Sequence, residues 1–535
     1  MKTRKNLWQL GVYFMFTTLM LCSCGKKKDN PNQFEYLAVQ MSKGDSWSII
    51  DKDGKEIVKE EYSPEAEISL ICDGVYWVKE DGKLTLFSVD QPKKPLINES
   101  FSQATHFAAG HALVSNPNQQ IRIINTVGKT VATLPKSIKT CDTFSSDGYA
   151  IYKDSEGKNG LIDTQGNIAI KASYAWMGSY ADGIVLAQSQ SDDKELLILD
   201  AQGKKLGTID LDKYDSFSFF SEGKVSVRSK GDDSHPIVLD KTGKKLFDIK
   251  KANSFALYQD GYAVVSKDGK YGLADDKGEL VIRLKYDNMS NFGNGIFAAK
   301  KGEKWGVVNA KDETLIDFDF DVIGGMLGKN YIVKDGGELA IIGQDGKEII
   351  SFDNVSTAGT SYRVEYVDVD GLTDALMKSI EEYEQPKTAA QMAKELSLSV
   401  NDFRYQRYIT QTQNIDNKVS GNLTTSFDEW VVEEKTHQEK VSDGWFSYNR
   451  TVSDGYHWTQ VLPTGTSGTL TLASDIGIGG ENVYAELCKK LQQGRTKISD
   501  GMFSKNVKVG GKNIESRTAI SVNGNDINLE ITFHK

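Results

Sequence analysis

The sequence is poor in the residues that build metal centres and many nucleophilic active sites. Of its 535 residues only five are cysteine and six are histidine. No CxxC, HxH or HxxxH spacing occurs, so neighbouring residues cannot supply a zinc cluster. No serine–histidine–acid triad can be assembled from the sequence either. We therefore expect a protein that is not an enzyme and that has no metal and no cofactor.

Proline is also scarce, and long apolar runs are nearly absent. The chain has nine prolines against 49 glycines, which indicates many tight turns and few rigid linkers. The apolar stretch from Leu7 to Leu21 is too short and too weakly apolar for a confident membrane span. It follows the basic residues Lys2, Arg4 and Lys5, an arrangement typical of an export signal.

The end of this stretch reads Leu21-Cys22-Ser23-Cys24-Gly25. It resembles the lipobox of bacterial lipoproteins, in which a cysteine that follows a small residue is cleaved and acylated. The resemblance implies a signal peptide over residues 1–24, with Cys24 carrying acyl chains such as palmitate, and a polar tether over 25–33. An ordinary signal peptide or an uncleaved anchor is the alternative. We expect localisation in a bacterial cell envelope, in the outer membrane or a periplasm-facing membrane, with the membrane as a partner through the lipid on Cys24.

Basic charge is in deficit. Removal of the signal leaves 61 basic residues against 74 acidic ones, a formal net charge of −13. Such an acidic body disfavours nucleic acid as a partner.

Cys72, Cys141 and Cys488 remain after processing, and separate buried thiols are favoured over one disulfide.

A turn of the form DxxG recurs along the first two thirds of the chain, at intervals of 34 to 40 residues from Asn125 onward. Asp or Asn at the first position hydrogen-bonds the backbone two residues later, and glycine at the fourth adopts a positive φ. The segment Gly128-Lys129-Thr130, which looks like the end of a phosphate loop, is one of these turns. The copies are Asp51–Gly54, Asn125–Gly128, Asp163–Gly166, Asp200–Gly203, Asp240–Gly243 and Asp275–Gly278, with degraded copies at 309–312 and 343–346.

Two further markers accompany each turn. One is a glycine that follows an aromatic residue by three or four positions, as in Phe292-Gly293-Asn294-Gly295. The other is Lys304-Trp305-Gly306-Val307-Val308, with a related segment at Lys270-Tyr271-Gly272-Leu273. The combined unit resembles the bacterial WG repeat, also called the KWG repeat, over residues 34–357. The resemblance implies a β-rich repeat domain, often exported, with no shared catalytic residue.

Repeats of about 37 residues with three or four short strands predict a stacked or radial array. We expect a mainly β domain over 34–357, a β-propeller of seven to nine blades with eight favoured. An open β-solenoid is the alternative. Because a single blade cannot bury its own face, the stability of the array is collective.

Residues 361–535 predict a separate α+β domain that resembles no family we identify. Helical spacing marks 372–384, Thr388 and Gln391 form a capping-box pattern before a second helix, and Val483, Leu487 and Leu491 mark a third. Two hairpins are expected, one joining 445–452 to 456–462 and one joining 518–522 to 527–533.

Four aromatic residues of the first hairpin are candidates for stacking on a ligand: Phe446, Tyr448, Tyr456 and Trp458. Pairing of the two strands would merge them into one stripe, which could bind a sugar or a protein. The alternative is a sheet face covered by the helices.

These observations together predict a non-enzymatic, lipid-anchored protein of the cell envelope whose repeat domain is a platform for protein–protein interaction. Its partner would be another envelope protein, or a glycan. A surface glycan-binding protein is one alternative, supported by the aromatic residues. An envelope hydrolase on a propeller scaffold is another.

Overall fold

The computed structural model divides the chain into two compact units, with the boundary between Tyr366 and Val367. Cys24 and the rest of the predicted signal peptide, residues 1–24, lie outside the described residues. Within the described part, no helix is long and apolar enough to span a membrane. The structure describes residues 33–230, 235–254, 257–356, 359–398, 408–415, 418–427, 432–442, 447–458, 462–473, 480–509 and 512–534.

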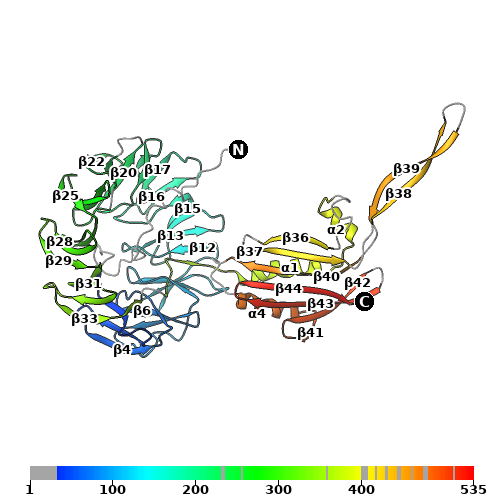
Figure 1. The fold of residues 1–535 in the computed structure, drawn as a ribbon, viewed down its shortest axis with the longest axis horizontal. Coiled ribbons are helices and arrows are strands. Elements are labelled where there is room, and N and C mark those ends of the chain that lie inside the picture. Colours follow the sequence, from blue (N-terminus) through cyan, green and yellow to red (C-terminus); the bar gives the residue numbers. More distant parts are fainter. Residues whose placement is uncertain are drawn as a thin grey trace. The chain divides into compact units, whose positions relative to one another are not determined.

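The first unit is a ring of small antiparallel sheets, the blades (Figure 1). The last strand of a blade lies at the rim of the ring and the first strand lies toward its centre. Over residues 33–356 the described strands form nine blades, of which the fourth and fifth are joined, together with a later strand, into one eight-stranded sheet. This count confirms the predicted propeller but exceeds the favoured number of eight. In chain order the blades are β2 (Tyr36–Gln40), β3 (Trp47–Asp51) and β4 (Glu56–Tyr62); β5 (Glu67–Ile68), β6 (Val75–Glu80) and β7 (Lys83–Ser88); β8 (Gln103–Ala104), β9 (His111–Ser115), β10 (Arg122–Asn125) and β11 (Thr130–Thr133); β12 (Ile138–Asp142), β13 (Tyr149–Asp154), β14 (Asn159–Asp163) and β15 (Ile168–Met177); β16 (Val185–Ser189), β17 (Glu195–Leu199) and β18 (Lys205–Asp210); β19 (Tyr214–Phe217), β20 (Lys224–Ser229), β21 (Pro236–Asp240) and β22 (Lys245–Asp248); β23 (Ala263–Lys267), β24 (Lys270–Ala274) and β25 (Leu280–Tyr286); β26 (Asn288–Gly293), β27 (Ile296–Lys301), β28 (Lys304–Asn309) and β29 (Thr314–Phe320); β30 (Val322–Leu327), β31 (Asn330–Asp335), β32 (Glu338–Ile342) and β33 (Glu348–Phe352).

The ring closes on itself, so the solenoid alternative is wrong. Strand β34 (Asn354–Ser356) returns to the first blade and pairs antiparallel with β2. The Ser356 hydroxyl donates to the Ile68 carbonyl at 2.7 Å and accepts from the Ile68 N–H at 3.1 Å. The short strand β1 (Gln33–Phe34) pairs parallel with β30 of the last blade. The two ends of the array therefore share a core in which Leu37 and Ile50 pack with Leu327 and Phe352.

The DxxG turns form as the sequence predicts. In the sixth blade the Asp240 carboxylate accepts from the N–H of Thr242 at 2.8 Å and of Lys244 at 3.0 Å, and Gly243 has φ +80°. The glycine also meets the neighbouring blade. A Cβ at Gly243 would lie 2.3 Å from the carbonyl oxygen of Thr208 in the fifth blade. Each turn is thus both a reversal of the chain and a contact between blades.

The Trp-Gly marker requires glycine for a different reason. Gly306 in β28 has an ordinary φ, but a Cβ there would lie 2.8 Å from the carbonyl oxygen of Ile316. The register between β28 and β29 shifts between Trp305 and Val307, and this irregularity brings the rim strand close to the Gly306 backbone. Gly272 meets Ile282 in the same way in the seventh blade, at 2.5 Å. The Trp-Gly motif therefore marks the position of a β-bulge in the blade.

The hairpin turns at the start of the blades are linked from one blade to the next. The Gly223 N–H donates to Asp182 of the preceding blade at 3.0 Å, and the Gly261 N–H donates to Glu222 at 3.1 Å. Similarly, the Asn294 N–H donates to Asp260 at 2.6 Å. These hydrogen bonds are a second set of contacts between neighbouring blades, in addition to those of the DxxG turns. They help to make the ring one cooperative body.

The segment that leaves the ring runs along the inner edges of its first blades. After β34, Ser361 forms a bridge with Thr105, and β35 (Arg363–Glu365) pairs antiparallel with β12, the first strand of the fourth blade. Arg363 donates to Asp142 at 2.5 Å, and Val364 is fully buried. Residues 361–366 thus belong to the ring.

The second unit is an α+β domain, as predicted. Its seven-stranded antiparallel sheet has the order β36-β37-β40-β44-β43-β42-β41, and α1 and α4 pack side by side with it around an apolar core. The predicted capping box of Thr388 and Gln391 is present, and the predicted hairpin at 518–533 is formed by β43 and β44. The elements are α1 (Val369–Tyr383), α2 (Ala389–Glu395), β36 (Tyr408–Ile415), β37 (Val419–Phe427), β38 (Val432–Ser442), β39 (Ser447–Trp458), β40 (Pro463–Leu472), α4 (Gly480–Gln492), β41 (Thr496–Ser499), β42 (Met502–Val509), β43 (Lys512–Asn523) and β44 (Asp526–His534).

Two of the remaining cysteines are free thiols. Cys141 is a buried free thiol, and burial raises its pKa well above the ordinary value. Cys488 is a half-buried free thiol. The expectation of separate thiols therefore holds for Cys141 and Cys488.

Candidate functional site

The three candidate aromatic residues that the structure describes lie on one strand rather than on two. The hairpin predicted around Ser453-Asp454-Gly455 does not form, because residues 447–458 run continuously as β39 and pair with β38. Gly455 has φ +90°, and the register shifts between Glu434 and Thr436 on the facing strand. The Ser-Asp-Gly segment is thus a bulge within a longer strand.

This arrangement separates the aromatic residues along β39. Tyr448 lies near one end of the strand, and its side chain is 57 % exposed. Tyr456 and Trp458 are at the other end of the same strand, eight or more residues away, or about 26 Å at the rise of an extended chain. Phe446 lies outside the described residues. The expected merger of two facing strands into one stripe is therefore wrong, while a ligand-stacking role for the individual residues stays a prediction.

Strands β38 and β39 together form what we call the arm, residues 432–442 and 447–458. Among the described strands the two pair only with each other (Figure 1). From Glu434 to Lys440 every side chain is exposed, and most of those facing them on β39 are exposed too. Polar pairs cross the arm at this level: Arg450 donates to Glu439 at 3.0 Å and Gln438 donates to Thr451 at 2.7 Å. Among residues 434–440 and the described residues that face them, the arm therefore has no apolar core.

A cavity of about 90 Å³ lies elsewhere in this domain, where α1 ends and the chain turns toward α2. Pro386 follows the last turn of α1, since it cannot continue the helix, and Thr388 caps the next one. One wall is the edge strand β36, whose inward positions are Ile409, Gln411, Gln413 and Ile415. Two amides thus occupy positions on a sheet face that is otherwise apolar. The cavity is lined by Glu382, Tyr383, Gln385, Lys387, Met392, Glu395, Gln411, Gln413, Thr425, Pro463 and Thr466.

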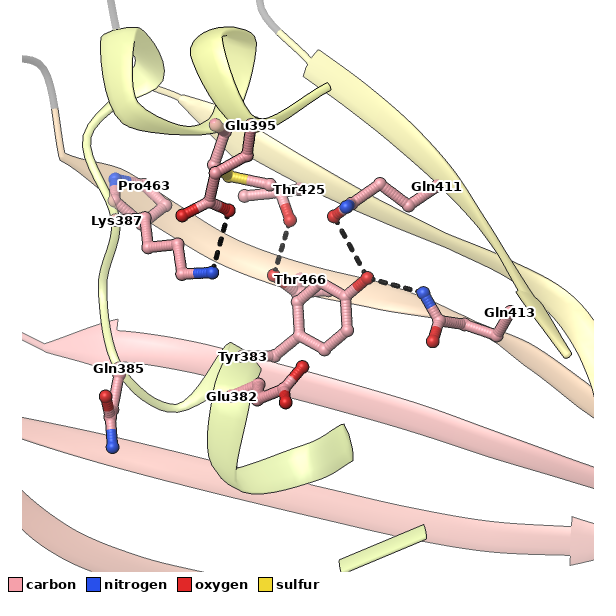
Figure 2. A pocket seen from close by; sticks show the side chains of 11 residues that line it. Glu382, Tyr383, Gln385, Lys387, Glu395, Gln411, Gln413, Thr425, Pro463 and Thr466 are labelled. Carbon is pink, nitrogen blue, oxygen red and sulfur yellow. Dashed lines mark hydrogen bonds and ion pairs between the residues drawn. The ribbon is translucent and has the colours of Figure 1, made fainter. Parts of the chain in front are cut away.

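Figure 2 shows Tyr383 between the two glutamines. The Gln413 amide donates to the Tyr383 hydroxyl at 2.8 Å, and that hydroxyl donates to the Gln411 carbonyl oxygen at 3.0 Å. Burial, with a smaller contribution from the Glu382 charge, raises the pKa of Tyr383 to about 12. The hydroxyl consequently stays protonated at neutral pH and remains a donor.

The remaining polar groups of the cavity are paired in two sets. Thr425 and Thr466 form a buried hydroxyl pair at 2.8 Å on facing strands β37 and β40. Lys387 and Glu395 form an ion pair at 2.8 Å across the mouth of the turn (Figure 2). Glu382 and Gln385 also line the cavity, and both are exposed.

A buried ion network holds the end of α1 beside the cavity. Glu384, the C-cap residue of α1, is fully buried and receives two bonds from Arg495, at 2.7 and 3.1 Å. Lys505 also pairs with this carboxylate, and Thr518 donates to it at 2.5 Å. Burial acts to raise the pKa of Glu384, but these partners more than offset it and hold the pKa below its usual value. The network fixes the adjacent residue, Tyr383, in place.

The arrangement is suited to hydrogen bonding. In the described part of the chain, no group of three histidine, cysteine, aspartate or glutamate side chains is placed to hold a metal ion. The cavity residues were missed by the sequence analysis because residues 408–415 were not assigned as a strand. The available signal was the alternation of isoleucine and glutamine from Ile409 to Ile415.

Comparison with known proteins supports the repeat assignment in part. The model of the family described as WG containing repeat matches residues 160–192 and 271–305. No curated protein sequence matches the chain.

Similar solved structures include a eukaryotic initiation factor, at 10 % identity over 60 % of this chain and 97 % of the other, with a TM-score of 0.42. BamB from Moraxella catarrhalis matches at 14 % identity over 52 % of this chain and 88 % of its own, with a TM-score of 0.29. The WD40 β-propeller domain of Doa1 matches at 13 % identity over 48 % and 94 %, with a TM-score of 0.24. The chain thus carries two segments similar to the WG containing repeat, within a propeller that its own sheet topology defines.

Proposed function

We propose that this chain is a non-enzymatic, lipid-anchored protein of the bacterial cell envelope that binds another protein. The ring serves as a rigid platform, and the arm is the element that binds the partner. The membrane anchor is the acylated Cys24 implied by the resemblance of Leu21–Gly25 to a lipobox. The partner is expected to be another protein of the envelope.

The arm is the observation that carries the proposal. An isolated two-stranded hairpin is at best marginally stable in water, and the arm has strands of 11 and 12 residues with no described third strand. Its outer edges offer unpaired backbone N–H and C=O groups, which form a template for another chain. Addition of a strand at an open edge is a common mode of protein recognition. A binding partner would supply the stability that the arm lacks.

Site-specific crosslinking in intact cells tests the binding role. A photo-reactive amino acid is placed at Tyr448 on the arm and, as the matched control, at Ile498 on β41, which is 47 % exposed in the same domain. We expect a discrete crosslinked protein from position 448 and none from 498. Equal adducts at both positions, or none at 448, would contradict the proposal.

The anchor has its own test with a built-in control. Cys24→Ser is expected to abolish incorporation of labelled palmitate and to release the protein from the membrane fraction. Cys22→Ser should leave both unchanged, because bulky Leu21 precedes that cysteine and makes it a poor cleavage site. Loss of label from Cys22→Ser alone would show that the lipobox is misassigned.

A further inference from the structure

One edge of the seven-stranded sheet is long, regular and uncharged. Strand β36 forms this edge and pairs with β37 along all eight of its residues without a bulge (Figure 1). No described strand pairs with its outer side. The strand, Tyr408 to Ile415, contains no charged residue and no proline. Proteins commonly protect such edges with lysine, proline, a bulge or a very short strand, and β36 has none of these features.

The other open edges of the same unit carry charge. Strand β41, at the opposite end of the sheet, has only four residues and includes Lys497. On the arm, β38 includes Glu434, Lys435, Glu439 and Lys440. An edge with fixed charges selects a partner of complementary charge, because like charges that face each other across two strands are destabilising. Two copies of an uncharged edge can approach without this repulsion.

The sequence of β36 reads almost the same in both directions. Residues 409–415 are Ile-Thr-Gln-Thr-Gln-Asn-Ile, so an antiparallel pair of identical strands centred on Thr412 brings like residues together. The facing pairs are then Thr412 with its own copy, Gln411 with Gln413, Ile409 with Ile415, and Thr410 with Asn414. The last pair alone is unlike, and both of its members are small and polar. A two-fold interface requires a surface that is complementary to itself in this way.

This register also preserves the two faces of the sheet. The side chains of Ile409, Gln411 and Gln413 lie on the face that the helices cover, where Ile409 packs with Met392 and the two glutamines bond with Tyr383. The alternate residues of β36 are exposed on the other face. A register shifted by one residue would place covered positions opposite exposed ones. Pairing centred on Thr412 sets covered against covered and exposed against exposed.

We propose that β36 is a self-association surface through which two copies of this chain form a dimer. The two β36 strands pair antiparallel about a two-fold axis at Thr412, and two seven-stranded sheets become one continuous sheet. The partner is a second copy rather than a different protein, because the pattern of the strand is complementary to itself. This interface goes beyond the binding role proposed for the arm and does not depend on it.

Disulfide trapping of the purified full chain tests the pairing. Thr412→Cys places two thiols directly opposite each other, with Cα atoms about 4.5–5.5 Å apart, which a disulfide can span. We expect a disulfide-linked dimer on a non-reducing gel after mild oxidation. Asn422→Cys is the matched control, because Asn422 faces Thr412 on β37 and is also exposed, but lies one strand further from the edge. It should yield no more dimer than the unaltered chain.

The register has a separate test. Thr410→Cys should not link to its own copy, since the two cysteines would be four residues apart along the strands, or about 13 Å. Mixed with chains that carry Asn414→Cys, it should form the disulfide. No dimer from Thr412→Cys would overturn the proposal, and so would equal yields from Thr412→Cys alone and Thr410→Cys alone, which indicate random collision.

Charge at the two-fold axis tests the interface without a crosslink. Thr412→Lys sets two lysines against each other, so we expect loss of the dimer in sedimentation velocity of the full chain. Mixing it with Thr412→Glu chains should restore the dimer. Asn422→Lys is the control, because it removes the same hydrogen bond, which Thr412 donates to Asn422 at 2.9 Å, yet it should stay dimeric.

The thermal midpoints of Thr412→Lys and Asn422→Lys should agree, which separates loss of the interface from loss of the fold. An unaltered chain that sediments as a monomer, or a dimer that survives Thr412→Lys, would overturn the proposal. None of these results bears on crosslinking at Tyr448.

Discussion

Some glycines of the repeats are required for two reasons: a positive φ and a close approach to the neighbouring blade. The sequence shows only the first of these. The positive φ of Gly243 follows from its place in the turn, and the sequence predicts it. The close approach to Thr208 does not appear in the sequence, because it involves the preceding blade. Gly261, in a hairpin turn, has nearly the same φ of +78° but open space around the position of a Cβ. Substitutions at these two positions can therefore distinguish the cost of backbone strain from the cost of disturbed packing between blades.

Replacing these two glycines by alanine should have unequal effects. Gly261→Ala is expected to cost about 1–2 kcal/mol for the left-handed conformation alone. Gly243→Ala should cost a further 1–3 kcal/mol or so, because its methyl group meets a backbone carbonyl that cannot rotate away. Urea unfolding, followed by hydrogen exchange of residues 236–248 for Gly243→Ala and of residues 263–274 for Gly261→Ala, measures the two losses. Equal losses would show that the blade contact yields without strain.

Glu384 is the second residue whose role depends on its surroundings. Its pKa is held below the ordinary value, so its stabilising effect is fully present above about pH 4.5 and is lost as the pH falls through the lowered pKa. Glu384→Gln would leave Arg495 and Lys505 without their buried counter-ion. We expect a loss of about 3–5 kcal/mol near pH 7. The difference from the unaltered domain should narrow as the pH falls below 4.5.

Hydrogen exchange of the second unit between pH 3 and 7 measures this dependence. Glu515→Gln serves as the control, because Glu515 pairs with Arg517 at 2.9 Å on a partly exposed face of the same sheet. Its removal should change stability little at any pH. An effect of Glu384→Gln that is independent of pH would contradict the role given to its charge.

Among the elements, the arm shows that a local pattern can predict a strand correctly without predicting which strand it pairs with. Residues 447–458 have the alternation of a strand, and the sequence predicts strands there. Their partner is 432–442 rather than the nearer 456–462, because a bulge at Gly455 costs less than breaking a long ladder. The choice of partner depends on energies summed over the whole hairpin.

Deletion of the arm should leave the rest of its domain intact. Replacing residues 432–458 by a short glycine–serine linker removes strands that pair with no other described strand. We expect the thermal midpoint of the domain and the exchange protection of β37 and β40 to stay unchanged. Lost protection in those two strands would show that the arm supports the sheet.

For the whole molecule, the decisive feature is the closure of the ring. Closure joins residues about 300 positions apart, such as Val39 with Val355. It gives every blade two neighbours, and in a repeat protein each interface contributes to the stability of the array. The exit segment adds to this effect by pairing with the fourth blade.

Two truncations test the importance of closure. A chain that ends at Tyr366 retains β34 and β35 and should keep the thermal midpoint of the ring. A chain that ends at Asp353 lacks both strands, so β2 loses its edge partner and Ile68 loses Ser356. We expect the shorter chain to unfold at a lower temperature and over a broader range, as followed by calorimetry. Identical transitions would mean that closure adds nothing.

The sequence by itself determined the turns, the strands that flank them and the division into a repeat region and an α+β region. These depend on neighbours a few residues apart: an Asp side chain that reaches its own turn, a glycine with positive φ, and alternating apolar residues. Turn residues of this kind repeat with little change, so they also revealed the period of about 37 residues.

Only the tertiary structure decided the blade number, the pairing of the arm and the cavity. Blade nine and β34 are recognised by what they pack against, since their own markers are degraded. Gln411 and Gln413 look in sequence like solvent-facing residues of an amphipathic strand. The end of α1 and helix α2 cover that face and convert it into a lined cavity. Such features arise from contacts between distant segments, which no local pattern encodes.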